Sequence, residues 1–262
     1  MRSLYIGATG MLAQQTNVDV ISNNIANMNT TAYTRRRAEF NDLLYQNIVR
    51  PGSQSSASQT VVPSGLQLGL GVRTAAVYRI TEGSGLTNTT NTLDLAIQGR
   101  GYFQIELPEG KGTAYTRDGA FQRNGDGVIV THDGYVVQPE ITIPEDAVEV
   151  YINNSGEVWV KQDGETDEIN VGQLELATFV NEAGLEAMGQ NLFLETEASG
   201  APNVDNPDTE GLGSILQGYL ETSNVNAVSE ITELVSAQRA YEMNSKIITI
   251  SDEMLTTINQ MN

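Results

Sequence analysis

Apolar residues recur every seven positions near the N-terminus of the chain. The repeat comprises Leu4, Met11, Val18 and Ile25, and it is joined by Ala8, Ile21 and Met28. Such a repeat places its side chains on one narrow face of an α-helix. The spacing therefore predicts an amphipathic helix from Leu4 to Met28.

A second repeat lies near the C-terminus, where residues 219–262 contain neither Gly nor Pro. Its members are Leu234, Tyr241, Ile248 and Leu255, flanked by Ala240, Ile247, Met254 and Met261. A single helix over this range would be ~66 Å long, several times the usual length in a globular domain. Side-chain oxygens of Ser223, Asn224 or Asn226 are candidates to cap its start.

The middle of the chain has a different pattern. Residues 46–74 are rich in Ser, Gln and Gly and contain Pro51 and Pro63, which favours extended or looped structure. From residue 86 onward, short segments rich in Val, Ile, Tyr and Phe alternate with turn pairs, which predicts antiparallel strands. The five turn pairs are Asp118-Gly119, Asp126-Gly127, Asp133-Gly134, Ser155-Gly156 and Asp163-Gly164.

These patterns predict an α+β fold. Long N- and C-terminal helices form a coiled-coil-like layer, and the middle is an antiparallel β-rich domain. We expect residues 1–30 and 223–262 to form a helical polymerisation domain, 31–85 an extended connecting region and 86–222 the β-rich domain. Trp159 and Phe179 are expected in the β core.

The net charge of −19 is unevenly distributed. Residues 1–123 carry a net charge of +3, and residues 124–262 carry −22. Nucleic acid is therefore excluded as a partner, because its phosphates would face a repulsive surface. The basic run Arg35, Arg36 and Arg37 is interpreted as a solvated loop or an intramolecular partner for acidic residues, with an acidic neighbouring subunit as the alternative.

Candidate chemistry is sparse. The chain has no Cys, which removes thiolate ligands and nucleophiles. His132, the only histidine, is expected on the surface beside a hairpin turn. The segments GLQLGLGVR and RNGDG lack the remaining residues of phosphate-binding and EF-hand loops, so we expect turns there, with a weak surface Ca²⁺ site at RNGDG as the alternative. No enzyme activity, cofactor or metal is predicted.

No apolar run approaches the roughly 20 residues that a membrane span needs. Residues 1–20 also lack the features of a cleavable signal peptide. Two helices that each carry an apolar face leave apolar surface in water, and neighbouring copies of the chain would cover it. A head-to-tail contact between copies that does not close into a ring produces a filament. Two alternatives remain: a monomer whose helices pack on the β domain, and a non-polymerising β module that binds carbohydrate or peptidoglycan.

The segment ISNNIANMNTTAY resembles the N-terminal signature of the flagellar rod and hook family, and ETSNVNAVSEITELVSAQRAYEMNSKIITISDEML resembles its C-terminal signature. In the middle, TNTLDLAIQGRGYFQI, AYTRDGAF and GYVVQPEITIP are similar to the β domain of that family. The resemblance covers nearly the whole chain. Residues 39–73 make it most similar to the distal rod branch, with a proximal rod or hook subunit as the alternative.

This resemblance implies a structural subunit of the bacterial flagellar basal body that polymerises into the distal rod, transmits torque to the hook and encloses an export channel. It implies transport by the flagellar export apparatus without signal cleavage, and a location in the periplasm up to the outer membrane. The implied partners are further copies of the chain, adjacent proximal rod and hook-side proteins, and the surrounding rings, without membrane insertion. The implied subunit interface comprises Leu4, Met11, Val18, Ile21, Asn24, Ile25, Asn27, Leu234, Tyr241, Ile248 and Leu255.

The asparagines at 23, 24, 27 and 29 are unusual in a helical pattern because Asn is a poor helix former. One interpretation is that they keep the segment unfolded before assembly and then form hydrogen bonds between subunits. The other is that they end the helix and form a turn towards Thr30. Ala32 stands where the family commonly has Gly, so a left-handed backbone is not expected there.

Overall fold

The computed structural model describes residues 2–50, 64–108, 112–164, 168–209 and 211–260. The α+β prediction is confirmed, with a helix near each end and antiparallel strands between them. The chain divides into two compact units. Unit 1 comprises residues 1–26, 36–79 and 226–262, and unit 2 comprises 27–35 and 80–225. The expected connecting region, 31–85, is therefore shared between the two units.

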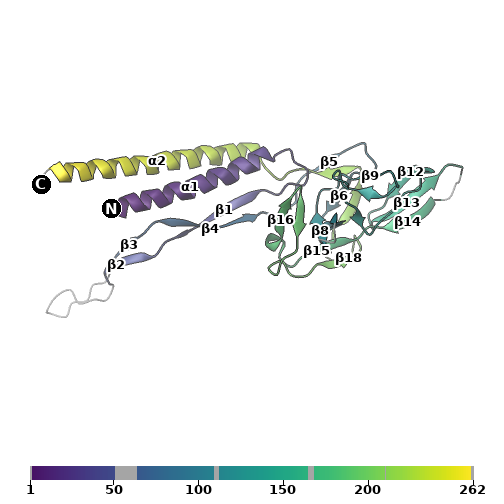
Figure 1. Ribbon diagram of the computed structural model, residues 1–262, viewed down its shortest axis with the longest axis horizontal. Helices are drawn as coiled ribbons and strands as arrows, with labels where there is room; N and C mark the ends of the chain where they lie inside the picture. Colours follow the sequence, from purple (N-terminus) through teal and green to yellow (C-terminus); the bar gives the residue numbers. More distant parts are fainter. Residues whose placement is uncertain (1, 51–63, 109–111, 165–167, 210, 261–262) are drawn as a thin grey trace. The chain divides into compact units, whose positions relative to one another are not determined.

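Unit 1 contains the two long helices, α1 (Arg2–Ala26) and α2 (Ala227–Gln260), which lie side by side and antiparallel (Figure 1). Gly7 packs against the side chain of Ile248, and Gly10 against that of Asn244. Because glycine has no Cβ, the two backbones approach closely at these positions. Neither α1 nor α2 carries an apolar run suited to crossing a bilayer, within the part of the chain that the structure describes.

Helix α2 is shorter than the sequence predicted, because residues 219–221 form strand β20 (Tyr219–Glu221). Its start is capped by Asn226, whose Oδ1 accepts hydrogen bonds from the N–H groups of Val228 (3.1 Å) and Ser229 (3.2 Å). Asn226 was one of the three predicted caps, and this prediction is confirmed. The cap satisfies backbone donors that have no partner within the helix.

Unit 1 also contains two pairs of strands. Strand β1 (Arg36–Asp42) pairs with β4 (Val72–Arg79), and β2 (Tyr45–Val49) pairs with β3 (Leu66–Gly69). Both pairs are antiparallel, with register shifts between Glu39 and Phe40 and between Asn47 and Val49. The expected extended segment is thus organised as paired strands where it is described. Residues 51–63, including Pro51 and Pro63, lie outside the described residues.

Unit 2 is built on a seven-stranded antiparallel sheet, in the order β16-β17-β8-β7-β15-β18 with β11 also on β7. A second sheet has the order β12-β13-β14, and the remaining strands form the pairs β19-β6, β20-β5 and β10-β9. The bounds are β5 (Leu86–Asn88), β6 (Leu95–Gln98), β7 (Tyr102–Glu106), β8 (Thr113–Thr116), β9 (Gln122–Arg123), β10 (Ile129–Val130), β11 (Val137–Gln138), β12 (Ala147–Ile152), β13 (Glu157–Gln162), β14 (Glu168–Gln173), β15 (Leu176–Thr178), β16 (Glu186–Gly189), β17 (Leu192–Leu194), β18 (Asn203–Asp205) and β19 (Ser214–Gln217).

The core of unit 2 contains Phe103 and Phe121, whose rings meet edge to face with centroids 5.0 Å apart. Phe179 is buried in a neighbouring cluster, as predicted. The prediction for Trp159 is wrong. Its neighbours Val158 and Val160 are buried, and because strand side chains alternate between faces, Trp159 lies half-buried on the other face, where its indole N–H donates to Glu157.

Four of the five glycine turn pairs adopt the conformation that a tight turn requires, with positive φ at Gly127, Gly134, Gly156 and Gly164. Gly119 serves a different purpose, because a Cβ added there would overlap the carbonyl oxygen of Leu95. Glycine is needed at this position because the two backbone segments approach too closely for a side chain.

The expectation for Ala32 is wrong. Its φ is +52°, in the left-handed region, and its side chain is buried. The N–H of Ala32 donates to the carbonyl of Glu221 at 2.9 Å. This bond, together with burial of the small methyl group, offsets the backbone cost of an L-residue in that region.

Candidate assembly surface

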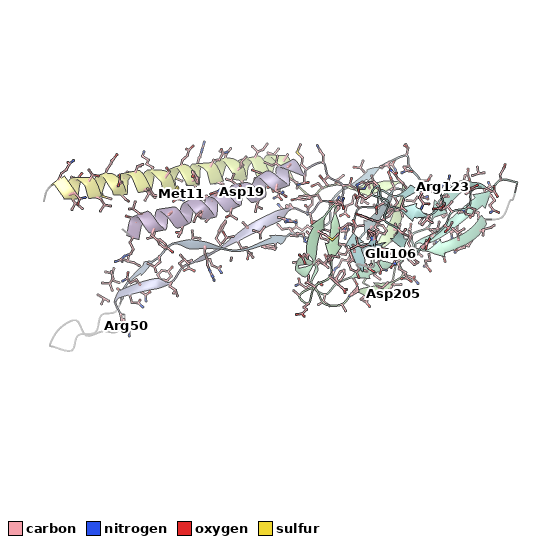
Figure 2. All side chains as sticks on the ribbon, viewed as in Figure 1. Met11, Asp19, Arg50, Glu106, Arg123 and Asp205 are labelled. Atoms are coloured by element: carbon pink, nitrogen blue, oxygen red, sulfur yellow. The ribbon has the colours of Figure 1, made fainter. Side chains whose placement is uncertain are left out.

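The predicted interface residues lie on α1 and α2, apart from Asn27, which directly follows α1. Ile21 and Asn24 are buried, and Ile248 packs against Gly7. Tyr241 is exposed, and Figure 2 shows Met11 on α1. The residues of intermediate exposure are Leu4, Met11, Val18, Ile25, Asn27, Leu234, Ile248 and Leu255. Of the heptad residues, Ile248 takes part in the pairing of α1 and α2 within the chain, and contact of the predicted residues with a second copy stays a prediction.

Asn24 uses its side chain inside its own chain. Its Nδ2 donates to the carboxylate of Glu230 (3.1 Å) and to the carbonyl of Arg36 (2.9 Å). Its Oδ1 accepts from the N–H of Arg36 (2.9 Å). Asn27, by contrast, begins the turn after α1, since its carbonyl and its Oδ1 both accept from Thr30. The helix-ending interpretation therefore describes Asn27, and Asn24 joins three segments of unit 1.

A second apolar stripe on α2 is exposed. It comprises Val228, Ile231, Val235, Met243, Ile247, Ile250, Met254 and Ile258, with exposed fractions between 41% and 76%. At ~100° per residue, the members of this stripe lie ~60° to ~180° around the helix from Ala237 and ~80° to ~160° from Ile248. The heptad analysis named Ile247 and Met254 only as residues flanking the repeat and missed the other members, because the helix is apolar on more than one face.

Apolar surface of this extent on one helix is unusual for a chain that remains alone in water. Single exposed apolar residues are common, but a continuous row marks an interaction site. Each side chain of the stripe keeps 41% to 76% of its surface exposed, so the described residues of unit 1 cover only about half of it or less at most positions. We identify this stripe as the candidate assembly surface.

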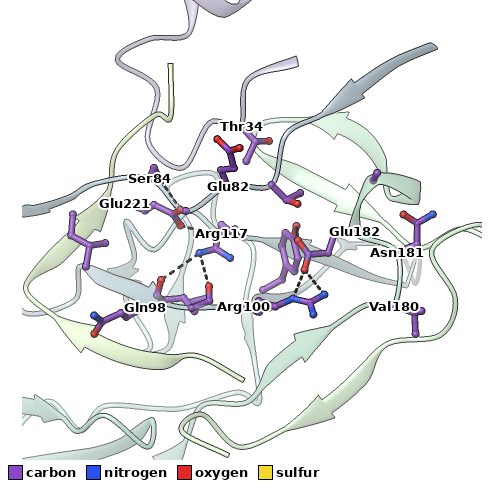
Figure 3. A pocket seen from close by; sticks show the side chains of 17 residues that line it. Thr34, Glu82, Ser84, Gln98, Arg100, Arg117, Val180, Asn181, Glu182 and Glu221 are labelled. Atoms are coloured by element: carbon purple, nitrogen blue, oxygen red, sulfur yellow. Dashed lines mark hydrogen bonds and ion pairs between the residues drawn. The ribbon is translucent and has the colours of Figure 1, made fainter. Parts of the chain in front are cut away.

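Unit 2 has a cleft of about 670 Å³, and both ionic and apolar residues line it. In its wall, Arg117 donates to the carboxylate of Glu221 at 2.8 Å and to the carbonyls of Ile97 and Gly99 (Figure 3). It also donates to the carbonyl of Gly101. Ser84 donates to the same carboxylate at 2.6 Å. These bonds tie β20 to the 97–101 segment.

The remaining candidate residues have ordinary surroundings. His132 is exposed in a turn, as predicted, with its Nε2 3.4 Å from Asp133. The RNGDG segment forms the predicted turn, in which the N–H of Val128 donates to Asn124. Arg35 pairs with Glu82 at 3.5 Å, while Arg36 and Arg37 are exposed. Among the described residues, no group of three or more His, Cys, Asp or Glu side chains is placed to hold a metal ion.

Three family models match the chain. They are a flagellar basal-body rod protein model over residues 4–34, the D1 domain of the flagellar hook protein group FlgE/F/G over 96–160, and the C-terminal domain of the FlgEFG rod proteins over 216–261. The flagellar basal-body rod protein FlgG of Caulobacter vibrioides is 58% identical over 261 residues, which cover 100% of this chain and 99% of that protein. The chain belongs to the flagellar basal-body rod family.

Other members of the flagellar rod family are similarly close along their whole length. The rod protein FlgG of Agrobacterium fabrum is 54% identical, covering 99% of both chains. That of Bacillus subtilis is 42% identical, covering 97% of both chains. Because the matched regions include both terminal helices, the candidate assembly surface lies within the part shared with these relatives.

Proposed function

We propose that this chain is a structural subunit that polymerises into the distal rod of the bacterial flagellar basal body. The observation that carries the proposal is the exposed apolar stripe on α2. The chain that bears this stripe is similar to a rod protein over its whole length. In the polymer, the stripe is covered by neighbouring copies, so the area it exposes to water in one chain becomes buried at ~25 cal/mol per Å².

Such a polymer would transmit torque to the hook and enclose a channel through which later subunits are exported. We place it in the periplasm, extending to the outer membrane, with proximal rod and hook-side proteins at its ends and the basal-body rings around it. No catalytic role is part of this proposal.

The test uses a flagellated bacterium from which its own distal rod gene has been removed. We expect the unaltered chain, expressed in a close relative, to restore swimming and hook-bearing basal bodies. The variant Ile250→Glu/Met254→Glu should be exported but fail to restore them, because carboxylates in the stripe oppose burial. The matched control is Thr249→Glu/Thr256→Glu, ~100° or more around α2 from Ile250 and Met254. Restoration by the stripe variant would contradict the proposal.

A further inference from the structure

A groove of about 530 Å³ runs along α1 beside β4, within unit 1. Its walls include Tyr5, Thr9, Leu12 and Thr16 of α1, with Val72 and Arg73 of β4. Leu12 is 64% exposed and Tyr5 is 55% exposed. The groove therefore presents apolar side chains to solvent along a helix, the kind of surface into which an apolar helix face packs.

The α2 helix of the same chain does not reach this groove. It packs on α1 at Gly7 and Gly10, and Leu12 lies ~200° around the helix axis from Gly10. The groove and the exposed stripe of α2 are thus two separate surfaces of unit 1, and each lacks a partner among the described residues of that unit.

The charges around the two surfaces are complementary. The groove wall and the neighbouring segments carry four exposed arginines, Arg36, Arg37, Arg50 and Arg73, against three exposed carboxylates, Asp19, Glu39 and Asp42 (Figure 2 labels Asp19 and Arg50). Of these residues, Asp19 and Arg73 line the groove itself. Helix α2 exposes four carboxylates, Glu233, Glu242, Asp252 and Glu253, against Arg239 and Lys246. Opposite net charges on two apolar surfaces favour their association with each other over pairing of like surfaces.

We propose that the groove between α1 and β4 of one copy receives the apolar stripe of α2 from the next copy. This inference rests on the assembly function proposed above and names its counter-surface. Because the two surfaces differ, the contact is heterologous: each added copy presents a fresh groove or a fresh stripe, so the assembly extends instead of closing as a dimer. Arg73 then lies where carboxylates of the incoming helix can pair with it.

Disulfide trapping tests this contact directly, because the chain has no cysteine of its own. The variants Leu12→Cys and Met254→Cys are purified separately with different tags, mixed, allowed to assemble and oxidised. Adjacent thiols react at a high effective concentration, so we expect the mixed dimer to form on the order of tenfold faster than in the control mixture. The control replaces Met254→Cys with Thr256→Cys, two residues away on another face.

A second experiment uses blocked surfaces. Leu12→Glu blocks the groove and Met254→Glu blocks the stripe, so each variant alone should remain monomeric. Their mixture should form dimers that do not extend, because one intact groove meets one intact stripe. If unaltered chains form tubes but the mixture stays monomeric and the cysteine pair reacts no faster than the control, the inference is overturned while the assembly function stands. If unaltered chains form no tubes, both fail.

Discussion

The side-chain amide of Asn24 donates to the carboxylate of Glu230, 206 positions later in the chain, at 3.1 Å. Both side chains are nearly inaccessible to water, with 1% and 3% exposure. The same amide is bonded to the backbone of Arg36 in both directions. One side chain therefore fixes α1, α2 and the start of β1 in a single register, which an apolar contact alone would leave free to slide.

Replacing Asn24 with Ala should lower the free energy of unfolding of the helical unit by about 1 to 3 kcal/mol, because it leaves a buried carboxylate without one of its donors. Urea unfolding followed by the helical circular dichroism signal measures this change. Gln15→Ala, at an exposed position of α1, is the matched control and should lie within about 0.5 kcal/mol of the unaltered chain. Equal stability of the two variants would show that the Asn24 bonds do not stabilise the unit.

Gly119→Ala should destabilise the β domain by several kcal/mol or prevent its folding, because the new methyl group would overlap the backbone carbonyl of Leu95. Gly125→Ala is the control, since a Cβ there meets no atom within 4 Å. Thermal unfolding of the two variants measures the difference. A melting temperature for Gly119→Ala close to that of Gly125→Ala would contradict the close approach of these two segments.

Arg117→Ala should cost about 3 to 5 kcal/mol of stability, because it leaves the Glu221 carboxylate buried without its cation. The exposed fractions of the two side chains are only 12% and 5%. Arg100 pairs with Glu182 at 2.8 Å, but its side chain is 63% exposed. Arg100→Ala should therefore cost about 0 to 1 kcal/mol. Denaturant unfolding ranks the two variants, and a reversed order would refute the assignment of Arg117 as the buried anchor.

The free energy of unfolding of the β domain at alkaline pH should depend on Tyr115. Burial raises the pKa of its phenol above the ordinary value of 10.0, and the nearby Glu195 carboxylate adds to the increase. The unfolded chain then ionises first, so the stabilising contribution is complete below about pH 10 and is lost as pH rises through the folded pKa. Unfolding titrations at increasing alkaline pH should show a shallower loss of stability for Tyr115→Phe. If Tyr115→Phe lost stability with pH as steeply as the unaltered chain, ionisation of Tyr115 would not contribute to the alkaline loss of stability.

Sequence periodicity predicted both helices because heptads and missing breakers are local signals. The cap at Asn226 was predictable for the same reason, because it depends only on residues next to it in the sequence. The start of α2 was harder to predict, because residues 219–221 pair with β5, which is distant in the sequence. The alternation of Val158, Trp159 and Val160 fits either face of a strand. Which face is buried depends on the neighbouring sheet, and this is why Trp159 was misplaced.

The candidate assembly surface was only partly predictable. The heptad repeat contains Ile248, which packs against Gly7 where α1 and α2 pair, whereas the exposure of the stripe emerges only when that pairing is known. The roles of Asn24 and Ala32 depend on Glu230 and Glu221, which are about 200 positions away along the chain. Contacts at that separation are set by the fold as a whole, so composition and spacing do not reveal them.

Electron microscopy of the purified chain at high concentration tests the central claim most directly. We predict straight tubes for the unaltered chain and for Thr249→Glu/Thr256→Glu, and only monomers for Ile250→Glu/Met254→Glu, whose circular dichroism should match that of the unaltered chain. Tubes formed by the stripe variant would contradict the claim that the exposed face of α2 drives assembly.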